Sequence, residues 1–339
     1  MALTLSFIGL LLGAIALLIV FLGYCQRARV YRPAQTLLMV SPDDFTYNAE
    51  TAASNAFEHD TGTAAENRQR ALAEFQQMVA QLRERRIRVL TLTSNPQTPT
   101  PDAVFPNNWF ISLPDTIPNS THLIFCPMLA PNRRAERQPQ ALQACLHTAG
   151  IAVTQQIDLS HLEQAQMMLE GTGSIVFDHQ NKIAYACPSP RTHLSALNQL
   201  AQLIDYTPMV FTATDPSGQA IYHTNIVLSI GPHHAVICDQ AITDLSVRAA
   251  VLRQLEAGGK RIICIDPQQM RNMCGNILTV RNQDGKSHIV LSRTAYDHFT
   301  EWQRRCLARF GKLVIVDIPT IETVGGGSSR CMLAEIYHS

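Results

Sequence analysis

A cysteine that follows a run of glycines is the most chemically suggestive feature of this sequence. The run covers residues 325–327, and Ser-Ser-Arg leads from it to Cys331. Glycines allow positive φ and a close approach of the backbone to a ligand. The thiolate is the reactive form of cysteine, so the pattern favours Cys331 as a nucleophile presented in a pocket. An ordinary buried cysteine after a turn is the alternative.

A nucleophilic cysteine needs a base or a cationic neighbour, and His223 is the best candidate. It stands in the polar segment Tyr-His-Thr-Asn beside a predicted strand. Glu170 begins a Gly-x-Gly turn, where its carboxylate can orient an imidazole. A structural histidine and a turn-capping carboxylate are the alternatives. Together these residues predict a Cys–His–Glu site lined with amides, since Asn108 and Asn225 stand in the same polar segments.

The elements that must position these residues follow an α/β pattern. Strands are predicted at 36–40, 87–92, 209–211, 261–265 and 312–316. Helices are predicted from a capping box at Thr63 and Glu66, with Leu72, Phe75, Val79 and Leu82 on one face, and around 194–204 and 245–255. Hairpins pair 174–177 with 183–186, 226–230 with 235–238, and 277–281 with 288–291. This recurring unit of hairpin, helix and strand indicates a solenoid, a propeller or a closed pseudo-symmetric array.

The composition excludes several classes of protein. The chain has 339 residues, with 27 basic and 27 acidic side chains. It has no basic tract, so nucleic acid is not an expected partner. Its nine cysteines are scattered without any C-x-x-C pair. That pattern argues against a disulfide framework and a zinc site, and it favours a reducing compartment.

The N-terminus carries an apolar segment long enough to span a bilayer. Residues 2–24 contain no charge, and three arginines follow them. This asymmetry favours an uncleaved anchor (residues 1–29) in the inner membrane, with a cytoplasmic catalytic domain (residues 30–339). A cleaved signal peptide that gives an exported protein, or a mis-assigned start that leaves a soluble cytoplasmic one, is the alternative.

The polar segments, taken in order, resemble the guanidino-modifying superfamily of arginine deiminase and amidinotransferase. Within it, the chain is most similar to the bacterial citrulline-utilisation hydrolases, the citrulline ureidases. The similarity covers residues 32–339, and it is carried by segments 32–36, 105–109, 130–137, 169–174, 189–192, 222–225 and the run before Cys331. It implies an α/β fold of five pseudo-symmetric ββαβ modules, a pentein-type propeller. To this the apolar segment adds an N-terminal transmembrane helix.

The resemblance also implies roles for single residues. The family nucleophile falls on Cys331, the general acid/base on His223, and its carboxylate partner on Glu170. Arginine deiminases carry aspartates where Asn108 and Asn225 stand. Carboxylates pair with a cationic guanidinium, whereas amides offer donors and acceptors without charge. The two asparagines therefore favour a neutral ureido head group.

We expect hydrolysis of citrulline to ornithine, carbon dioxide and ammonia through a covalent intermediate on cysteine. No metal or organic cofactor is implied. The substrate carboxylate requires arginines, and the candidates are Arg191 and Arg330, followed by Arg133 and Arg134. These arginines are otherwise structural ion-pair partners. Arginine deiminase or amidinotransferase activity on a guanidino substrate is one alternative. A catalytically silent, membrane-tethered scaffold is the other.

Overall fold

Three-stranded sheets of one internal pattern recur five times along the chain. The computed structural model describes residues 31–114 and 117–338. In every sheet the central strand pairs antiparallel with one neighbour and parallel with the other. With the central strand second, the sheets are β15 (Ala334–Ile336), β1 (Thr36–Val40) and β2 (Arg88–Leu92); β3 (Phe110–Pro114), β4 (Ser120–Phe125) and β5 (Ala152–Asp158); β6 (Ile175–Asp178), β7 (Ile183–Ala186) and β8 (Thr207–Val210); β9 (Leu228–Ile230), β10 (His234–Ile237) and β11 (Arg261–Cys264); β12 (Leu278–Arg281), β13 (Ser287–Ser292) and β14 (Lys312–Val316).

Helices provide the crossovers that parallel strands require. They connect the central strand of each sheet to its third strand. These are α3 (Ala64–Glu84), α5 (Pro139–Thr148), α7 (Leu194–Ile204), α9 (Leu245–Ala257), and the pair α11 (Arg293–His298) and α12 (Glu301–Leu307). Shorter turns lie between them: α2 (Ala49–Ala52), η1 (Pro106–Asn108), α4 (Pro131–Arg134), η2 (Ser160–Ala165), α6 (Gly171–Ser174), α8 (Thr224–Val227), η3 (Asp239–Ala241), α10 (Pro267–Arg271) and α13 (Pro319–Gly325).

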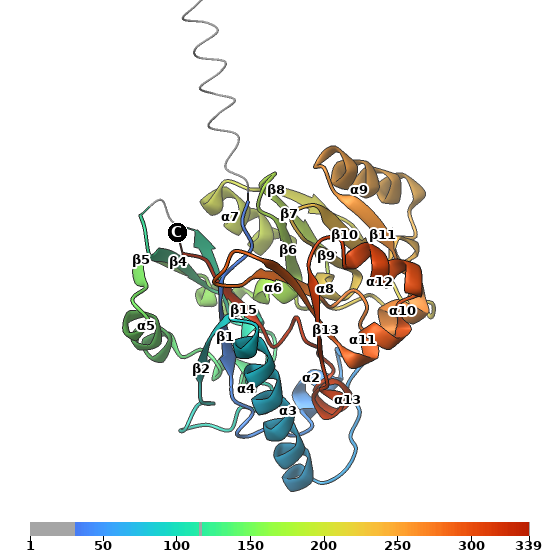
Figure 1. Ribbon diagram of the computed structural model, residues 1–339. Helices are drawn as coiled ribbons and strands as arrows, with labels where there is room; N and C mark the ends of the chain where they lie inside the picture. Colours follow the sequence, from blue (N-terminus) through green and yellow to red (C-terminus); the bar gives the residue numbers. More distant parts are fainter. Residues whose placement is uncertain (1–30, 115–116, 339) are drawn as a thin grey trace, which may run out of the picture. The chain divides into compact units, whose positions relative to one another are not determined.

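The first strands of neighbouring sheets lie side by side. β15 contacts β3, and β9 contacts both β6 and β12. Figure 1 shows the short elements α6 and α8 among these strands, with α5, α7 and α9 further out. The turns that precede the first strands are therefore brought close to one another.

The predicted capping box at the start of α3 is confirmed. The Thr63 side chain accepts from the backbone N–H of Glu66, and the Glu66 side chain accepts from the backbone of Thr63. The buried side chains of this helix include Ala71, Phe75 and Met78. Leu72 was expected on this face but is only half-buried. It lies one position, or about 100°, from the buried stripe.

The three predicted hairpins are confirmed, with boundaries that shift by one residue in most strands and by two at the start of β9. Residues 226 and 227 belong to α8, so β9 begins at Leu228. Every residue of β1, β7 and β10 is buried. Strands covered on both faces appear as continuous apolar runs, which is why these strands were visible in the sequence. The hairpin of β3 and β4 and the short strand β15 were not predicted.

The predicted membrane anchor at residues 2–24 lies outside the described residues. Across 31–114 and 117–338, no helix is long and apolar enough to cross a bilayer. The described chain from Pro33 onward forms one compact unit. The eight cysteines described in it are all unpaired.

Candidate active site

The predicted site residues stand immediately before the first strands of their sheets. Asn108 precedes β3, Glu170 precedes α6 and β6, and Cys331 precedes β15. His223 is the residue before α8, and Asn225 lies within α8, just before β9. All five side chains are buried. Because α6 contacts both η1 and α8, the polar segments that precede the first strands lie close to one another.

Glu170 and His223 form a buried, directly bonded pair. His223 Nε2 lies 2.9 Å from Glu170 Oε2. Burial alone would raise the pKa of Glu170, but Arg191 and His223 outweigh it and hold that pKa well below its usual range. Burial lowers the pKa of His223 to about 4, despite the nearby carboxylate. The pair is therefore a charged carboxylate that accepts from a neutral imidazole, and Nδ1 is the ring nitrogen left to exchange a proton.

The glycines of the Glu-Gly-x-Gly motif permit this approach. A Cβ at Gly173 would lie 2.3 Å from Asn108 Nδ2 and 2.8 Å from His223 Nδ1. Gly171 has a φ of +45°, and a Cβ there would lie 2.2 Å from the backbone oxygen of Asn107. Any larger residue at position 173 would displace two of the predicted site residues.

The nucleophile candidate is held by amides. Cys331 Sγ lies 3.6 Å from Asn225 Nδ2 and 3.2 Å from Asn276 Nδ2. Asn276 was not predicted as a site residue. It precedes the predicted strand at 277–281, a position equivalent to that of Asn108 before β3. An asparagine just before a predicted first strand is the signal that would have indicated it.

The glycine run differs from expectation in its backbone. Of the three residues, Gly326 has a positive φ, of +63°. Gly325 and Gly327 are required by packing instead. A Cβ at either position would lie within 2.9 Å of the Phe105 ring. The run thus lets the loop before Cys331 lie flat against an aromatic side chain.

Two of the four candidate arginines reach the site. Arg133 Nη1 donates to Asn108 Oδ1 at 3.2 Å, and its Nε and Nη2 donate to Glu136 at 2.8 and 2.9 Å. Burial opposes the charge of Arg133, but Glu136 outweighs it and raises the pKa. Arg191 Nη1 lies 3.5 Å from Glu170 Oε2. Both guanidinium groups are therefore buried, charged and close to the predicted catalytic residues.

The other two arginines are engaged elsewhere. Arg134 Nε donates to the Met128 carbonyl at 3.0 Å. Arg330 donates to the Leu333 carbonyl and to Glu335 Oε2, both at 2.7 Å. Neither side chain lines the chamber around Cys331. Their contacts stabilise the local chain, so the structure does not bring them together with the other candidates.

Two carboxyl groups that were not predicted also face this chamber. Asp102 Oδ2 accepts from Asn48 Nδ2 at 2.7 Å and from Thr51 Oγ1 at 3.1 Å. Its Oδ1 is buried and has no hydrogen-bond partner among the described residues. Burial, and then the charge of Asp102, raise the pKa of Glu58 to about 8. Glu58 is therefore largely neutral at neutral pH.

The chamber has about 10 Å³ of free space, room for about one water molecule. Its lining includes Asn55, Glu58, Asp102, Phe105, Asn108, Arg133, Arg191, Tyr222, His223 and Cys331. An amino acid needs more room, so a wall must move before a substrate can enter.

A larger cavity of about 540 Å³ lies on the other side of a thin wall. Residues 54–59 form this wall: Asn55 and Glu58 line the chamber, whereas Ser54, Phe57 and their neighbours line the larger cavity. Tyr222 lines both spaces, and its hydroxyl donates to the Gly326 carbonyl at 3.0 Å. We call this space the outer cavity.

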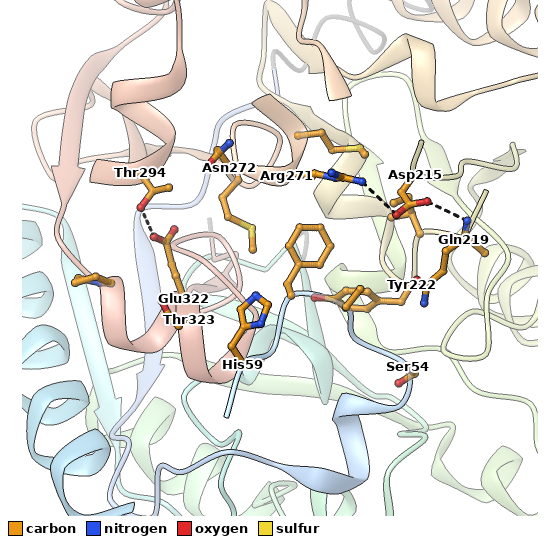
Figure 2. A pocket seen from close by; sticks show the side chains of 17 residues that line it. Ser54, His59, Asp215, Gln219, Tyr222, Arg271, Asn272, Thr294, Glu322 and Thr323 are labelled. Atoms are coloured by element: carbon orange, nitrogen blue, oxygen red, sulfur yellow. Dashed lines mark hydrogen bonds and ion pairs between the residues drawn. The ribbon is translucent and has the colours of Figure 1, made fainter. Parts of the chain in front are cut away.

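Figure 2 shows the polar groups of the outer cavity. Arg271 and Asp215 form an ion pair of 3.7 Å, and Thr294 donates to Glu322 at 2.6 Å. The side chain of Arg271 is half exposed. None of the predicted catalytic residues lines this cavity.

Comparisons with known proteins agree with this architecture. The family model for eukaryotic N,N-dimethylarginine dimethylhydrolase matches residues 41–338. No protein of curated function matches the sequence. The N-terminal domain of ArgZ, a cyanobacterial arginine dihydrolase solved with bound substrate, superimposes with a TM-score of 0.67 and 15% identity. That match covers 89% of this chain and 98% of that domain.

Two further solved structures share the fold. AgrE, as a mutant bound to L-arginine, matches with a TM-score of 0.66 and 17% identity, over 89% of this chain and 40% of AgrE. SxtG, an amidinotransferase from Microseira wollei, matches with a TM-score of 0.63 and 12% identity, over 91% and 96% of the two chains. This chain spans about 41% of full-length ArgZ.

The family match and the shared fold thus place the chain in the guanidino-modifying superfamily. Within it, the chain belongs to the dimethylarginine dimethylhydrolase family, whose model covers nearly all of the described residues.

Proposed function

We propose that this protein hydrolyses citrulline to ornithine, carbon dioxide and ammonia. The observation that carries the proposal is the amide beside the nucleophile. Asn225 places Nδ2 3.6 Å from Cys331 Sγ, and its Oδ1 is buried without a hydrogen-bond partner among the described residues. A ureido group offers N–H donors to such an oxygen and a carbonyl to nearby amide donors.

The surroundings of Asn108 support a neutral head group. Asn108 Oδ1 already accepts from the charged guanidinium of Arg133 at 3.2 Å. A substrate guanidinium beside Asn108 would bring a second buried cation close to the first, and like charges repel strongly where water is excluded. A neutral ureido group avoids this repulsion.

The reaction requires one nucleophile and one proton carrier. Cys331 Sγ gives its proton to His223 Nδ1 and attacks the ureido carbon. A C–N bond then breaks as the departing nitrogen takes that proton from His223. His223 Nδ1 then accepts a proton from water, which attacks the carbon and releases the thiol. Glu170 fixes the ring through Nε2. Citrulline and one water thus give ornithine and a carbamate, which decomposes to carbon dioxide and ammonia.

Other side chains of the chamber suit the amino-acid end of the substrate. Arg191 and Arg133 offer positive charge to a carboxylate. Asp102 Oδ1 is a buried acceptor without a partner among the described residues, as a substrate ammonium group requires. We assign these three side chains to substrate binding.

The test is a product assay with citrulline and arginine side by side. We expect ornithine and ammonia from citrulline, and a much lower kcat/KM for arginine. Preference for arginine would overturn the substrate assignment.

Hydrolysis of arginine is the second candidate. The chain shares its fold with ArgZ, an arginine dihydrolase, and with AgrE, which was solved with bound L-arginine. The observation that favours a cationic substrate is Asp102 in the chamber, whose Oδ1 is a buried acceptor without a partner among the described residues. The same assay separates the two, because the products of arginine are measured directly.

We also propose that residues 2–24 anchor the enzyme in the inner membrane, with the catalytic domain in the cytoplasm. The support is the uncharged segment with arginines on its C-terminal side. Fractionation of cells should place the intact protein with the membranes. A mature protein that begins after residue 25 would contradict the anchor.

A further inference from the structure

The repeat unit that begins with β12 also contributes a side chain that contacts the nucleophile candidate. Asn276 lies between α10 and β12, at the entrance of β12. It is 1% exposed. Its Nδ2 lies 3.2 Å from Cys331 Sγ, closer than the 3.6 Å from Asn225 Nδ2. The sulfur therefore has two amide nitrogens from two different repeat units as neighbours.

Neighbouring groups fix the orientation of the Asn276 amide. Its Oδ1 accepts from the backbone N–H of Arg330 at 3.1 Å, and its Nδ2 donates to the Asn225 carbonyl at 3.3 Å. The amide nitrogen is the nearer atom to the sulfur, at 3.2 Å, whereas Oδ1 lies 3.6 Å from Sγ, where it accepts from the thiol. A thiolate has no proton to donate, so Nδ2 is the group that can stabilise it. Gly275 allows this segment to lie close to α8. A Cβ at this position would lie 2.0 Å from the Ile226 carbonyl oxygen.

We propose that Asn276 is a catalytic residue whose amide N–H, together with that of Asn225, stabilises the thiolate of Cys331. Hydrogen bonds to a charged acceptor are stronger than those between neutral groups. A cysteine enzyme must supply such stabilisation from nearby donors or cations. The inference rests on Cys331 as the nucleophile of the proposed function, but it is independent of the substrate.

The state of His223 explains why amides are needed. Its Nε2 is bonded to Glu170, and burial lowers its pKa to about 4. The imidazole is thus neutral near pH 7, so it does not supply the positive charge that would favour a thiolate. The other ionisable groups that line the chamber with the cysteine are Glu58, Asp102, Arg133, Arg191 and Tyr222. The guanidinium of the adjacent Arg330 is bonded to Glu335 instead.

The experiment measures the thiol itself, without substrate. The full-length protein is treated with iodoacetamide over a range of pH, and alkylation of Cys331 is quantified by peptide mass spectrometry. Cys264, which is exposed, is the internal reference in the same sample. The variant is Asn276→Asp, which keeps an oxygen for the Arg330 N–H but replaces the donor by a negative charge.

The matched control is Asn282→Asp. Asn282 is also buried, lies in the same sheet unit, and donates Nδ2 to the Arg85 carbonyl at 3.0 Å. For Asn276→Asp we expect alkylation of Cys331 at neutral pH to slow by about tenfold or more, as for loss of a hydrogen bond to a charged group. The midpoint of its pH profile should also move upward. The rate at Cys264 should not change, and Asn282→Asp should behave like the wild type.

An unchanged rate and midpoint at Cys331 in Asn276→Asp would overturn the proposal, as would an equal effect of Asn282→Asp. If Asn276→Asp does not fold, Asn276→Ala removes the donor without adding a charge, and the same outcomes apply. Failure of citrulline hydrolysis in the product assay would leave this result intact, so the two proposals fail separately.

Discussion

The chamber at Cys331 and the outer cavity differ in size and in exposure, although residues 54–59 and Tyr222 contribute to the lining of both. The chamber has about 10 Å³ of free space, whereas the outer cavity has about 540 Å³. The ionisable side chains of the chamber are buried. The outer cavity is roomy, and its ion pair of Arg271 with Asp215 is partly exposed. Charges interact more strongly where water is excluded, whereas exposed ion pairs contribute little to stability.

The comparison shows that cavity size does not locate the chemistry. The proposed nucleophile, the proposed acid/base pair and the amides all lie in or beside the smaller space, because each precedes the first strand of its sheet. The outer cavity lacks these residues.

The largest expected effect is that of Cys331→Ser. A hydroxyl is far harder to ionise than a thiol at neutral pH, so we expect kcat to fall by several orders of magnitude with the fold retained. The control is Arg271→Ala in the outer cavity, which should keep kcat within about threefold, as expected where an exposed pair is lost. Retention of a substantial fraction of activity in Cys331→Ser would exclude the covalent mechanism.

The next largest effect should come from Gly173→Ala. The added methyl group would meet Asn108 Nδ2 and His223 Nδ1 at 2.3 and 2.8 Å, so both side chains must shift. We expect a loss of about a hundredfold or more in kcat, because misplacement of about 1 Å is costly in catalysis. Thermal unfolding should show that the variant still folds. Normal activity would mean that His223 and Asn108 are not held in place by this contact.

A third test concerns the charge of the head group. In Asn108→Asp with Asn225→Asp, two carboxylates would face the ureido oxygen, and an unpaired buried carboxylate is costly. Arg133 would neutralise the one at position 108, so the single variants should differ, with Asn225→Asp the more damaging. We expect the ratio of kcat/KM for citrulline to that for arginine to fall. A ratio that moves further toward citrulline would show that these amides do not distinguish charge.

The smallest expected effect is on stability. Glu58 has a pKa of about 8, against an ordinary value of 4.5, through burial and Asp102. Between these values the folded state holds a proton that the unfolded state has lost, so Glu58 makes the wild type less stable as pH rises. Glu58→Gln cannot titrate, so its Tm relative to that of the wild type should rise over this interval. A difference that is constant with pH would contradict a neutral Glu58.

Local motifs were sufficient to identify part of this site. Glu170 and His223 stand in short polar segments that interrupt apolar strands, and the structure brings them within 2.9 Å. Arg133 and Arg134 show the limit of such reasoning. Neighbours on a helix point about 100° apart, and one reaches Asn108 while the other bonds to a carbonyl. The sequence alone does not distinguish them.

Residues that depend on the packing of the repeat units were out of reach. Asp102 lies in a turn, and nothing near it in the sequence indicates that Thr51 and Arg133 surround it. β15 has three residues and pairs with β1 at the other end of the chain. A strand this short has no periodic pattern in the sequence that would predict it. Long-range pairings of this kind emerge only when the five sheets are assembled.

The most direct test of the account is rapid-quench trapping of the full-length enzyme during turnover of citrulline. Peptide mass spectrometry of the quenched protein should find a covalent adduct derived from the ureido group on Cys331. The adduct should form before ornithine accumulates and should be absent from Cys331→Ser. Turnover with no adduct on Cys331, or with an adduct on another residue, would contradict the central claim that this cysteine attacks the ureido carbon.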